Sequence, residues 1–401
     1  MIELWDLAVL LLGAKIGGSI FSRANQPSLI GELLAGILLG SVFNVVAKGP
    51  TIDIVAQLGA MFLILLTMMT IDFSKIDREI EKLVAAQVIS AGLILLMLLA
   101  FFRMMNIPIN LMLFVAVAIF GSSTAIAART LMTMNVMNSK EGQAIVGLQI
   151  INGIIELLLI SSVLNVVQYN SFEVEPIIKL ILIIIGTVVV MSRVGGKFIN
   201  WLFSYAQQFK MEDVLLALTL VFAFTAAGIA EKSGMTSFLG IMLVGMLISR
   251  APQARTISQK IKELGDSFFI PIFFASLGLG VSYTVLGQNL TLLVSLLLAV
   301  TFIRFIAYTI PVRFMDYSIL ESMKIGAGMI SMSEYGLLIL SLGIGYGVLD
   351  QTLYSIFVII FLAINLLSPF ILKLLFGIQP FPYSRTWEKK GIRNSFYRTK
   401  K

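Results

Sequence analysis

One pattern fills almost the whole chain of 401 residues: an apolar stretch of about 20 residues, a short polar segment, then another apolar stretch. Hydrophobic residues make up 58% of the chain and charged residues only 13%, whereas soluble domains carry about 25% charged residues. The mean hydropathy is +0.97. These features predict an all-α polytopic membrane protein with about 13 transmembrane helices. The predicted spans are Leu4–Phe21, Ser28–Ala47, Ile54–Ile71, Leu83–Met105, Ile109–Met134, Gly142–Gln168, Pro176–Leu202, Val214–Ala230, Ser237–Ser249, Ser267–Val281, Leu290–Val312, Met323–Tyr346 and Leu353–Phe376.

The charges between these stretches predict the orientation of the chain. The acidic start, MIELWDLAVLLLGAK, lacks the features of a removable signal and is interpreted as the first span. An odd number of spans places the termini on opposite sides, and the positive-inside rule then puts the N-terminus outside and the C-terminus in the cytoplasm. The basic tail, 377–401, is better explained by anionic lipid than by nucleic acid. The basic residues assigned to cytoplasmic loops are Arg23, Lys75, Arg78, Lys82, Lys140, Lys210, Arg250, Arg255, Lys260, Lys262 and Arg313.

The chain contains neither cysteine nor histidine. It therefore offers no thiol or imidazole as a nucleophile, metal ligand or switch near neutral pH, and proton chemistry falls to carboxylates. An intramembrane hydrolase is disfavoured, because no paired aspartates lie deep in the predicted spans. No cofactor is expected.

The predicted spans divide into six, one connector and six. The transmembrane domain, 1–376, then consists of a first repeat over about 1–168, a connector helix over about 176–202 and a second repeat over about 212–376. The fifth span of each half has a small, polar interruption: FGSSTA at 120–125 and GMISMSEYG at 328–336. Paired interrupted helices in inverted repeats indicate the binding site of a secondary transporter. The alternative is that these glycines and serines only allow close helix packing.

Glu156 lies near the middle of the sixth predicted span. Gln149 and Asn152 precede it at spacings of seven and four residues, so all three share one helix face. A carboxylate at this depth costs about 2.5–3.5 kcal/mol on insertion scales and normally faces a bundle interior or a cavity. Desolvation disfavours its charge, so it can take up either a proton or a cation. The alternative is a structural carboxylate paired with an arginine such as Arg304.

The two interruptions supply the other candidate ligands. Glu334 is a second deep acid, and it either binds a proton or accepts hydrogen bonds from the broken backbone. Ser122, Ser123 and Thr124 offer hydroxyls and unwound carbonyls to a monovalent cation, unless these hydroxyls bond back to their own helix. Ser333 is a secondary candidate. Three further acids lie near span ends and are interpreted as structural (Glu32), interfacial (Glu231) and a boundary residue (Asp72).

Five segments, in order, resemble signatures of the monovalent cation:proton antiporters, in the branch with Nap-type and Kef-type exchangers of sodium or potassium for protons. Each signature is weak by itself, whereas the ordered set covers nearly the whole membrane domain. The segments are PSLIGELLAGILLGS (27–41), the run LGAMFLILLTMMTIDF that ends near Asp72, FGSSTAIAARTL (120–131), SFLGIMLVGMLIS (237–249) and FFIPIFFASLGLGVS (268–282).

The resemblance implies two crossing broken helices, a core domain that moves like an elevator against a dimerisation domain, and a homodimer. It also implies an ion site on the sixth span, whose usual residue pair ends in aspartate. That pair falls on Asn152 and Gly153, so glycine stands in place of the aspartate. On the twelfth span, Met332, Ser333 and Glu334 stand where Arg-Gly-Glu is common. We hypothesise that Glu156, one turn after Gly153, is the relocated carrier.

On this hypothesis Asn152 and Thr124 are the neutral ligands of Na⁺ or K⁺; in a weaker version Glu334 is the carrier. The predicted function is antiport of protons against Na⁺ or K⁺ in the cell membrane, contributing to pH homeostasis. One carboxylate that holds either ion predicts an electroneutral exchange of one cation for one proton. The alternative is a relative that has lost transport and senses ions or the membrane, although such a protein has no evident need for a costly acid at Glu156.

Overall fold

A computed structural model describes residues 4–24, 26–70, 80–105, 109–169, 214–232, 237–249, 251–282, 284, 287 and 289–377. Helices and short connections account for almost all of these residues, and one isolated bridge is the only β pairing among them. The all-helical class is therefore confirmed for this part of the chain. The predicted connector helix 176–202, Asp72 and the tail from 378 onward lie outside the described residues.

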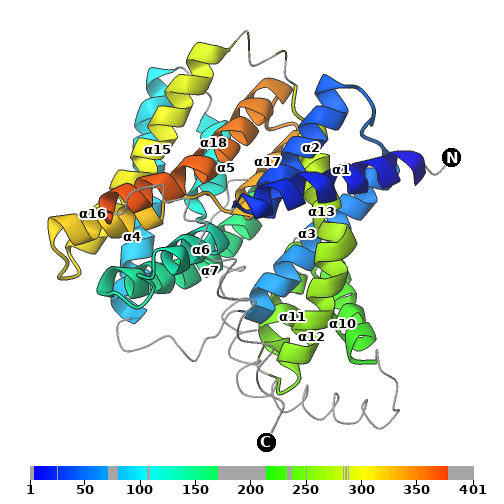
Figure 1. Ribbon diagram of the computed structural model, residues 1–401, viewed down its shortest axis with the longest axis horizontal. Coiled ribbons are helices and arrows are strands. Elements are labelled where there is room, and N and C mark those ends of the chain that lie inside the picture. Colours follow the sequence, from blue (N-terminus) through cyan, green and yellow to red (C-terminus); the bar gives the residue numbers. More distant parts are fainter. Residues whose placement is uncertain are drawn as a thin grey trace, which may run out of the picture.

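Contacts between helices divide the described chain into two groups that lie side by side (Figure 1). The first group, called here the scaffold bundle, comprises α1 (Leu4–Arg23), α2 (Ser28–Ile37) with the π-helix η1 (Leu38–Val42), α3 (Pro50–Thr70), α10 (Val214–Lys232), α11 (Ser237–Ile248), α12 (Ala254–Leu264), the π-helix η4 (Gly265–Phe269) and α13 (Ile270–Leu279). The second group, the core bundle, comprises α4 (Ile80–Met104), α5 (Ile109–Phe120), α6 (Thr124–Thr133), α7 (Lys140–Tyr169), α15 (Leu290–Arg313), α16 (Ile319–Gly328), α17 (Glu334–Gly345) and α18 (Gln351–Leu375). Each bundle thus takes helices from both halves of the sequence.

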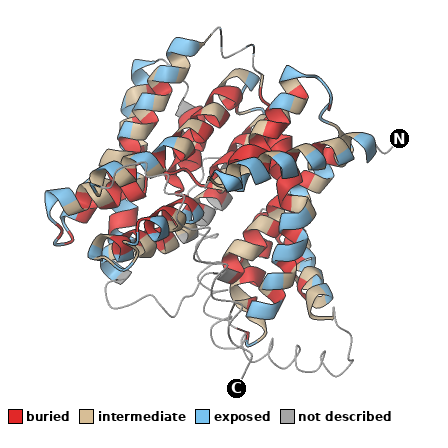
Figure 2. Ribbon diagram, in the orientation of Figure 1, coloured by how far each residue is buried: buried red, intermediate tan, exposed pale blue. Residues whose placement is uncertain are grey.

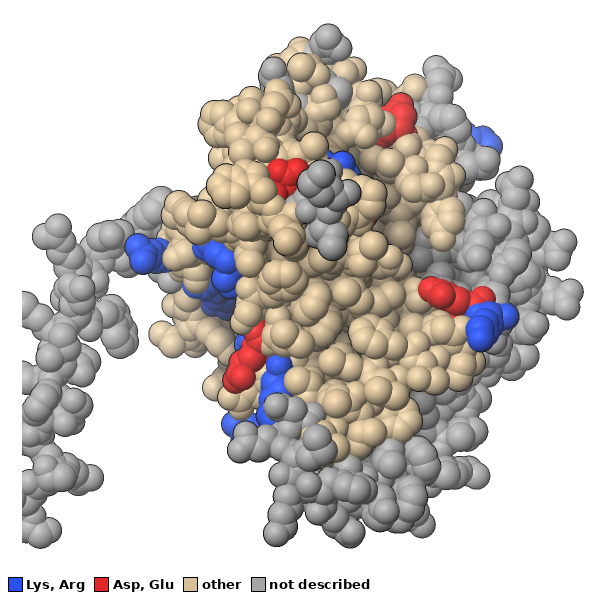
Figure 3. Space-filling model, turned by 90° about the vertical axis from the view of Figure 1, so that its right-hand side faces the viewer, with Lys and Arg blue, Asp and Glu red and all other residues tan. Residues whose placement is uncertain are grey.

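The surface of the described helices suits a lipid environment. Six of them, α1, α3, α4, α10, α15 and α18, are long and apolar enough to cross a membrane. Figure 2 shows buried residues inside the bundles and exposed residues on their outer faces, where large apolar side chains such as Leu12, Ile16 and Phe302 are found. In Figure 3 one side of the molecule is mostly uncharged. These features are consistent with a multi-pass membrane protein.

The helix that contains the tenth predicted span begins earlier than the sequence indicated. Arg255, Lys260 and Lys262 were assigned to a cytoplasmic loop, but all three lie in α12, whose helical backbone continues through η4 into α13. Ile257 and Ile261, one turn apart, are buried, so α12 is amphipathic. A search for apolar stretches overlooks such a helix because its charged face lowers the average hydropathy.

The scaffold helices α1 and α2 meet through two glycines. A Cβ atom at Gly17 would lie 2.3 Å from the carbonyl oxygen of Gly31, and one at Gly31 would lie 2.1 Å from the carbonyl oxygen of Gly17. Close backbone approach at small residues is the usual way that helices pack where lipid removes the hydrophobic driving force. This contact fixes the two helices that carry one wall of the cavity described below.

Both predicted interruptions are present in the core bundle. α5 ends at Phe120 and α6 begins at Thr124, while α16 ends at Gly328 and α17 begins at Glu334. The four short helices therefore form two broken helices, and their inner ends meet (Figure 1). Backbone that leaves a helix in this way needs partners from neighbouring groups, because lipid supplies none.

Candidate functional site

The two interruptions pair with each other through backbone hydrogen bonds. One antiparallel β-bridge joins them. The backbone N–H of Ser123 donates to the carbonyl of Ser331 at 3.2 Å, and that of Ser333 donates to the carbonyl of Gly121 at 3.0 Å. These bonds satisfy some of the polar groups that the ends of four helices leave free.

Asn152, on α7, is buried and its side chain holds the first interruption. Its Oδ1 accepts the N–H of Ser122 at 2.7 Å, and its Nδ2 donates to the hydroxyl of Tyr308 at 3.0 Å and to Oε1 of Gln87 at 3.2 Å. The Tyr308 hydroxyl in turn donates to the carbonyl of Phe120, the last residue of α5. The amide of Asn152 is therefore engaged by protein groups, and its role as a cation ligand stays a prediction.

Asn365, on α18, holds the second interruption in the same manner. Its Oδ1 accepts the N–H of Met332 at 2.7 Å and its Nδ2 donates to the carbonyl of the same residue at 3.0 Å. Met332 and Ser122 are the two residues of the β-bridge, so the two asparagines meet equivalent points. The sequence analysis missed Asn365, although an asparagine in the middle of the last apolar stretch was a signal.

Arg304, on α15, is completely buried and binds carbonyls of the second interruption. Its Nε donates to Ile330 at 2.7 Å, and its Nη2 donates to Met329 at 2.8 Å and to Ser331 at 2.7 Å. No ion pair between Arg304 and Glu156 occurs in the described structure, where the two charges interact only at longer range. The alternative of a direct pair with Glu156 is therefore not found.

Glu156 is 1% exposed and its carboxylate lies against the first interruption. A Cβ atom at Gly121 would lie 1.7 Å from Oε1 of Glu156, so a side chain there would require the carboxylate to move. The Ser333 hydroxyl, from the second interruption, is a hydrogen-bond neighbour of the same carboxylate. Oε1 is buried and has no hydrogen-bond partner among the described residues. Glu156 thus touches both interruptions.

Glu334 begins α17, and Ser123 of the first interruption lies beside its carboxylate. Oε2 of Glu334 and Oγ of Ser123 are both buried without a hydrogen-bond partner in the described part of the chain. Thr124, by contrast, is exposed at the start of α6. The structure therefore brings both acids and Ser123 together, while the predicted ligand Thr124 lies at the edge of the group.

Gln149 joins the same group from α7. Its Nε2 donates to Oγ of Ser122 at 2.8 Å and to the carbonyl of Gly328 at 3.3 Å, whereas its Oε1 is buried without a partner. Four of the predicted site residues thus each present one buried oxygen that no described protein group satisfies. They are Ser123, Gln149, Glu156 and Glu334.

Gly153, which stands where the family resemblance implies an aspartate, has open space beside it. A Cβ atom there would meet no atom within 4 Å. The packing around α7 therefore leaves room for a side chain at position 153, so packing does not require glycine there.

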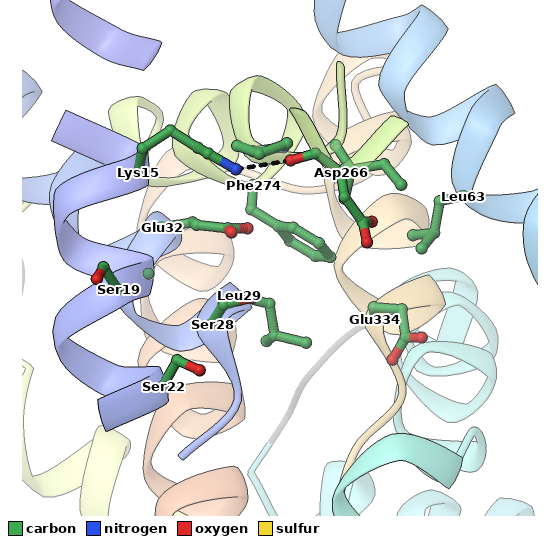
Figure 4. Close-up of a pocket in the computed structure, with 13 residues that line it drawn as sticks. Lys15, Ser19, Ser22, Ser28, Leu29, Glu32, Leu63, Asp266, Phe274 and Glu334 are labelled. Carbon is green, nitrogen blue, oxygen red and sulfur yellow. Dashed lines mark hydrogen bonds between the residues drawn. The ribbon is translucent and has the colours of Figure 1, made fainter. Parts of the chain in front are cut away.

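The two interruptions, 121–123 and 329–333, together with Glu334 are called here the crossing. A cavity of about 390 Å³ lies between the scaffold bundle and the crossing (Figure 4). Glu334 is the member of the crossing that lines it, and the rest of its wall comes from α1, α2, α3, η4 and α13. Glu32 also lines it and is only 6% exposed. The sequence analysis gave Glu32 a structural role because it lies near a span end, but α1 and α13 pack over α2 and bury it.

Comparison with known proteins assigns this architecture. The family described as "Sodium/hydrogen exchanger, transmembrane" matches residues 8–377. The chain belongs to this family. The recognition made from the sequence signatures is therefore confirmed, and the chain is of a transporter family, not of a class of conventional enzymes.

Two bacterial relatives can be aligned with this chain over almost their full length. The chain is 23% identical to the probable Na⁺/H⁺ antiporter GerT of Bacillus cereus over 90% of this chain and 95% of that protein. It is 26% identical to a Na⁺/H⁺ antiporter of Enterococcus hirae over 92% and 96% of the two chains. The chain is also 26% identical to the K⁺ efflux antiporter 6 of Arabidopsis thaliana, over 87% of this chain but only 59% of that protein. The fold is similar to that of the sodium proton antiporter MjNhaP1 from Methanocaldococcus jannaschii, with a TM-score of 0.72 over 94% of this chain and 98% of that chain at 15% identity.

Proposed function

We propose that this protein is a secondary-active antiporter that exchanges protons for Na⁺ or K⁺ across the cell membrane. Family membership and the names of the relatives support antiport of this kind. The observation that carries the proposal is the group of four buried, unpartnered oxygens around the crossing, which includes both deep acids. Oxygen atoms from carboxylate, amide and hydroxyl groups are ligands that a hard monovalent cation accepts in place of water.

The carrier in this mechanism is Glu156. In its ionised form it binds the cation, and in its protonated form it cannot, so the same oxygen atoms couple the two fluxes. Arg304 supplies one fixed positive charge, while Glu156 and Glu334 together supply two negative charges when ionised. One proton or one monovalent cation restores neutrality in either state, which gives electroneutral exchange. Asn152 and Thr124 remain the proposed neutral ligands of the cation, Ser123 and Glu334 belong to the same ion- and proton-binding site, and Gln149, Ser122 and Ser333 are secondary.

Alternating access follows from movement of the core bundle against the scaffold bundle, as an elevator. The division of helix contacts into two groups supports this proposal, because a bundle that keeps its own contacts can move as a unit. The equivalent roles of Asn152 and Asn365 support two repeats, which we propose to be inverted and to form about 13 spans with the connector. We further propose a homodimer with an external N-terminus and a cytoplasmic C-terminus, which contributes to pH homeostasis.

The deciding experiment is collapse of a pH gradient in liposomes that contain the purified protein, on addition of Na⁺, K⁺ or Li⁺. Wild type is compared with Glu156→Gln, Glu334→Gln and the matched control Glu231→Gln, which neutralises an exposed carboxylate at the end of α10. We expect cation-dependent proton flux in wild type and in Glu231→Gln, and its loss in Glu156→Gln.

Flux that survives in Glu156→Gln and is lost in Glu334→Gln would transfer the carrier role to Glu334. No flux in folded wild type would favour the alternative of an ion or membrane sensor, to which the glycine at position 153 points. A current driven by membrane potential alone would contradict electroneutral exchange.

A further inference from the structure

The cavity between the bundles has a second acid on the wall opposite Glu334. Glu32 extends from α2 toward the cavity, and Glu334 lines it from α17 (Figure 4). Ser19 and Ser22 of α1, which also line it, are exposed, so the cavity reaches the surface along this helix. A path along polar side chains thus leads from the surface past Glu32 to the crossing.

Glu32 is a buried carboxylate without an ion-pair partner in the described residues. It is 6% exposed, and no Lys or Arg nitrogen of the described chain lies within 4 Å of it. The Ser28 hydroxyl, one turn earlier on α2, is its hydrogen-bond neighbour. Gly18 of α1 gives it room, since a Cβ there would lie 3.0 Å from Oε1. A buried carboxylate with so little compensation is costly unless a cation or a proton accompanies it.

Lys15 is the nearby cation, but its ammonium is engaged elsewhere. Its Nζ donates to the backbone carbonyl of Asp266 at 2.8 Å, which links α1 to η4 along the cavity wall (Figure 4). The cavity is therefore lined by three carboxylates, those of Glu32, Asp266 and Glu334, against one ammonium.

When its three carboxylates are ionised, the cavity carries a net negative charge, and in that state its charge and its dimensions suit a partly hydrated cation. A volume of about 390 Å³ holds on the order of ten waters at about 30 Å³ each. Apolar walls that include Leu29 and Phe274 keep the local dielectric low, which strengthens the attraction of the carboxylates for a cation. Such a cavity concentrates cations near the crossing.

We propose that Glu32 forms an entry subsite that binds a monovalent cation in the cavity before the cation reaches Glu334 and the crossing. This inference rests on the proposed antiport, of which it describes one step. Glu32 belongs to the scaffold bundle, so it delivers the cation to the core bundle and takes no part in the exchange with protons. Its effect therefore falls on the apparent KM for the cation and leaves kcat unchanged.

The test measures cation-dependent proton flux in liposomes over a range of Na⁺ and K⁺ concentrations. We expect Glu32→Gln to raise the apparent KM about 5- to 10-fold with kcat within about twofold of wild type, Glu32→Asp to restore much of the affinity, and Lys15→Gln to lower the KM. Asp53→Asn is the matched control, because Asp53 is an exposed carboxylate of the same bundle, paired with Lys48 on the surface.

Wild-type KM in Glu32→Gln, or a fall in kcat with KM unchanged, would overturn the subsite while leaving the antiport intact. If Glu32→Gln does not fold, Glu32→Asp and Lys15→Gln decide by the directions of their KM changes. If wild type shows no flux, binding of ²²Na⁺ to the purified protein replaces it. Loss of binding in Glu32→Gln then supports the subsite although the antiport has failed, and equal binding overturns both.

Discussion

The two interruptions are joined by one β-bridge and are each held by an asparagine, but the rest of their support differs in chemistry. Each has an asparagine on the following helix, Asn152 or Asn365, that accepts the N–H of the bridge residue at 2.7 Å. At the end of α5, the carbonyl of Phe120 accepts a hydrogen bond from a neutral group, the Tyr308 hydroxyl. The carbonyls of residues 329–331, after the end of α16, accept hydrogen bonds from the guanidinium of Arg304. One interruption is thus neutral in its supports and the other carries a fixed positive charge.

This difference separates the charge of Arg304, which supports the structure, from the charge of Glu156, which a proton or a cation can neutralise. The carbonyls after α16 form the negative end of a helix dipole, and Arg304 neutralises it with short hydrogen bonds that do not depend on a transported ion. Glu156 lies against the neutral interruption, close to the start of α6, where a helix dipole favours negative charge. The acid is therefore stabilised without a direct salt bridge, which leaves its oxygens available to a proton or a cation.

The largest effect is expected from Arg304→Met. Three carbonyls would lose charged donors inside the protein, and the charge of Glu156 would lose its compensation, so we expect a loss of roughly 3–5 kcal/mol of stability. Thermal unfolding in detergent measures it. Arg313→Met is the control on the same helix, since Arg313 is exposed and donates to a single carbonyl, that of Tyr317. Similar losses in the two variants would contradict a special role for Arg304.

The second prediction concerns the neutral interruption and compares substitutions at two glycines, Gly121 in the interruption and Gly153 on α7. Gly121→Ala puts a methyl group 1.7 Å from Oε1 of Glu156, so the carboxylate must move away. We expect exchange to fall at least tenfold while the protein stays folded, because the end of a flexible side chain can yield. Gly153→Ala is the matched control, as its methyl group meets nothing within 4 Å, and it should retain exchange. Near-normal flux in Gly121→Ala would show that the observed position of Glu156 is not the active one.

Much of this comparison was predictable from the sequence. Glycine and serine in otherwise apolar stretches identify both interruptions in the sequence. Paired interruptions of this kind are typical of transporter binding sites. Glu156 and Glu334 were identified as buried acids for the same reason. These features depend on local composition, which a sequence shows directly.

The supports of the interruptions were not predictable in the same way. Arg304 was considered as a partner of Glu156, but its hydrogen bonds go to residues 329–331, and only the packing of α15 on α16 decides between them. Glu32 was interpreted as structural because it lies near the end of a predicted span in the sequence. It is buried by α1 and α13, whose positions depend on close contacts at glycines far apart in sequence.

The two asparagines permit a test of the equivalence of the interruptions. Asn152→Ala and Asn365→Ala each leave a buried backbone N–H without an acceptor, so each should cost about 1–3 kcal/mol. Chemical unfolding in detergent measures both losses. Only Asn152→Ala should also change the KM for the cation, because Asn152 shares its helix face with Glu156. Equal effects of the two variants on KM would argue against a difference in function between the interruptions.

The smallest effect is expected at the outer end of α16, which leads into the charged interruption. Ser318 and Glu321 form a capping box there: the Ser318 N–H donates to the Glu321 carboxylate at 2.7 Å, and the Ser318 hydroxyl accepts the N–H of Glu321. These hydrogen bonds, with the backbone N–H of Ser318 first, lower the pKa of Glu321. Glu321 precedes the apolar part of this helix and is accessible to water.

A lowered pKa fixes the sign of the pH dependence. The capping contribution is present above the unfolded pKa of a glutamate, about 4.3, and is lost as the pH falls through the lower folded value. We therefore expect Glu321→Gln to be slightly less stable than wild type at pH 7 and the difference to shrink as the pH falls to 3, as measured by thermal unfolding at both pH values. Glu263→Gln, which neutralises an exposed acid at the end of α12, is the matched control and should be about as stable as wild type at pH 7. An undiminished difference at pH 3 would mean that the charge of Glu321 does not stabilise the start of α16. Of Glu321 and Arg304, only Arg304 would then support the second interruption by its charge.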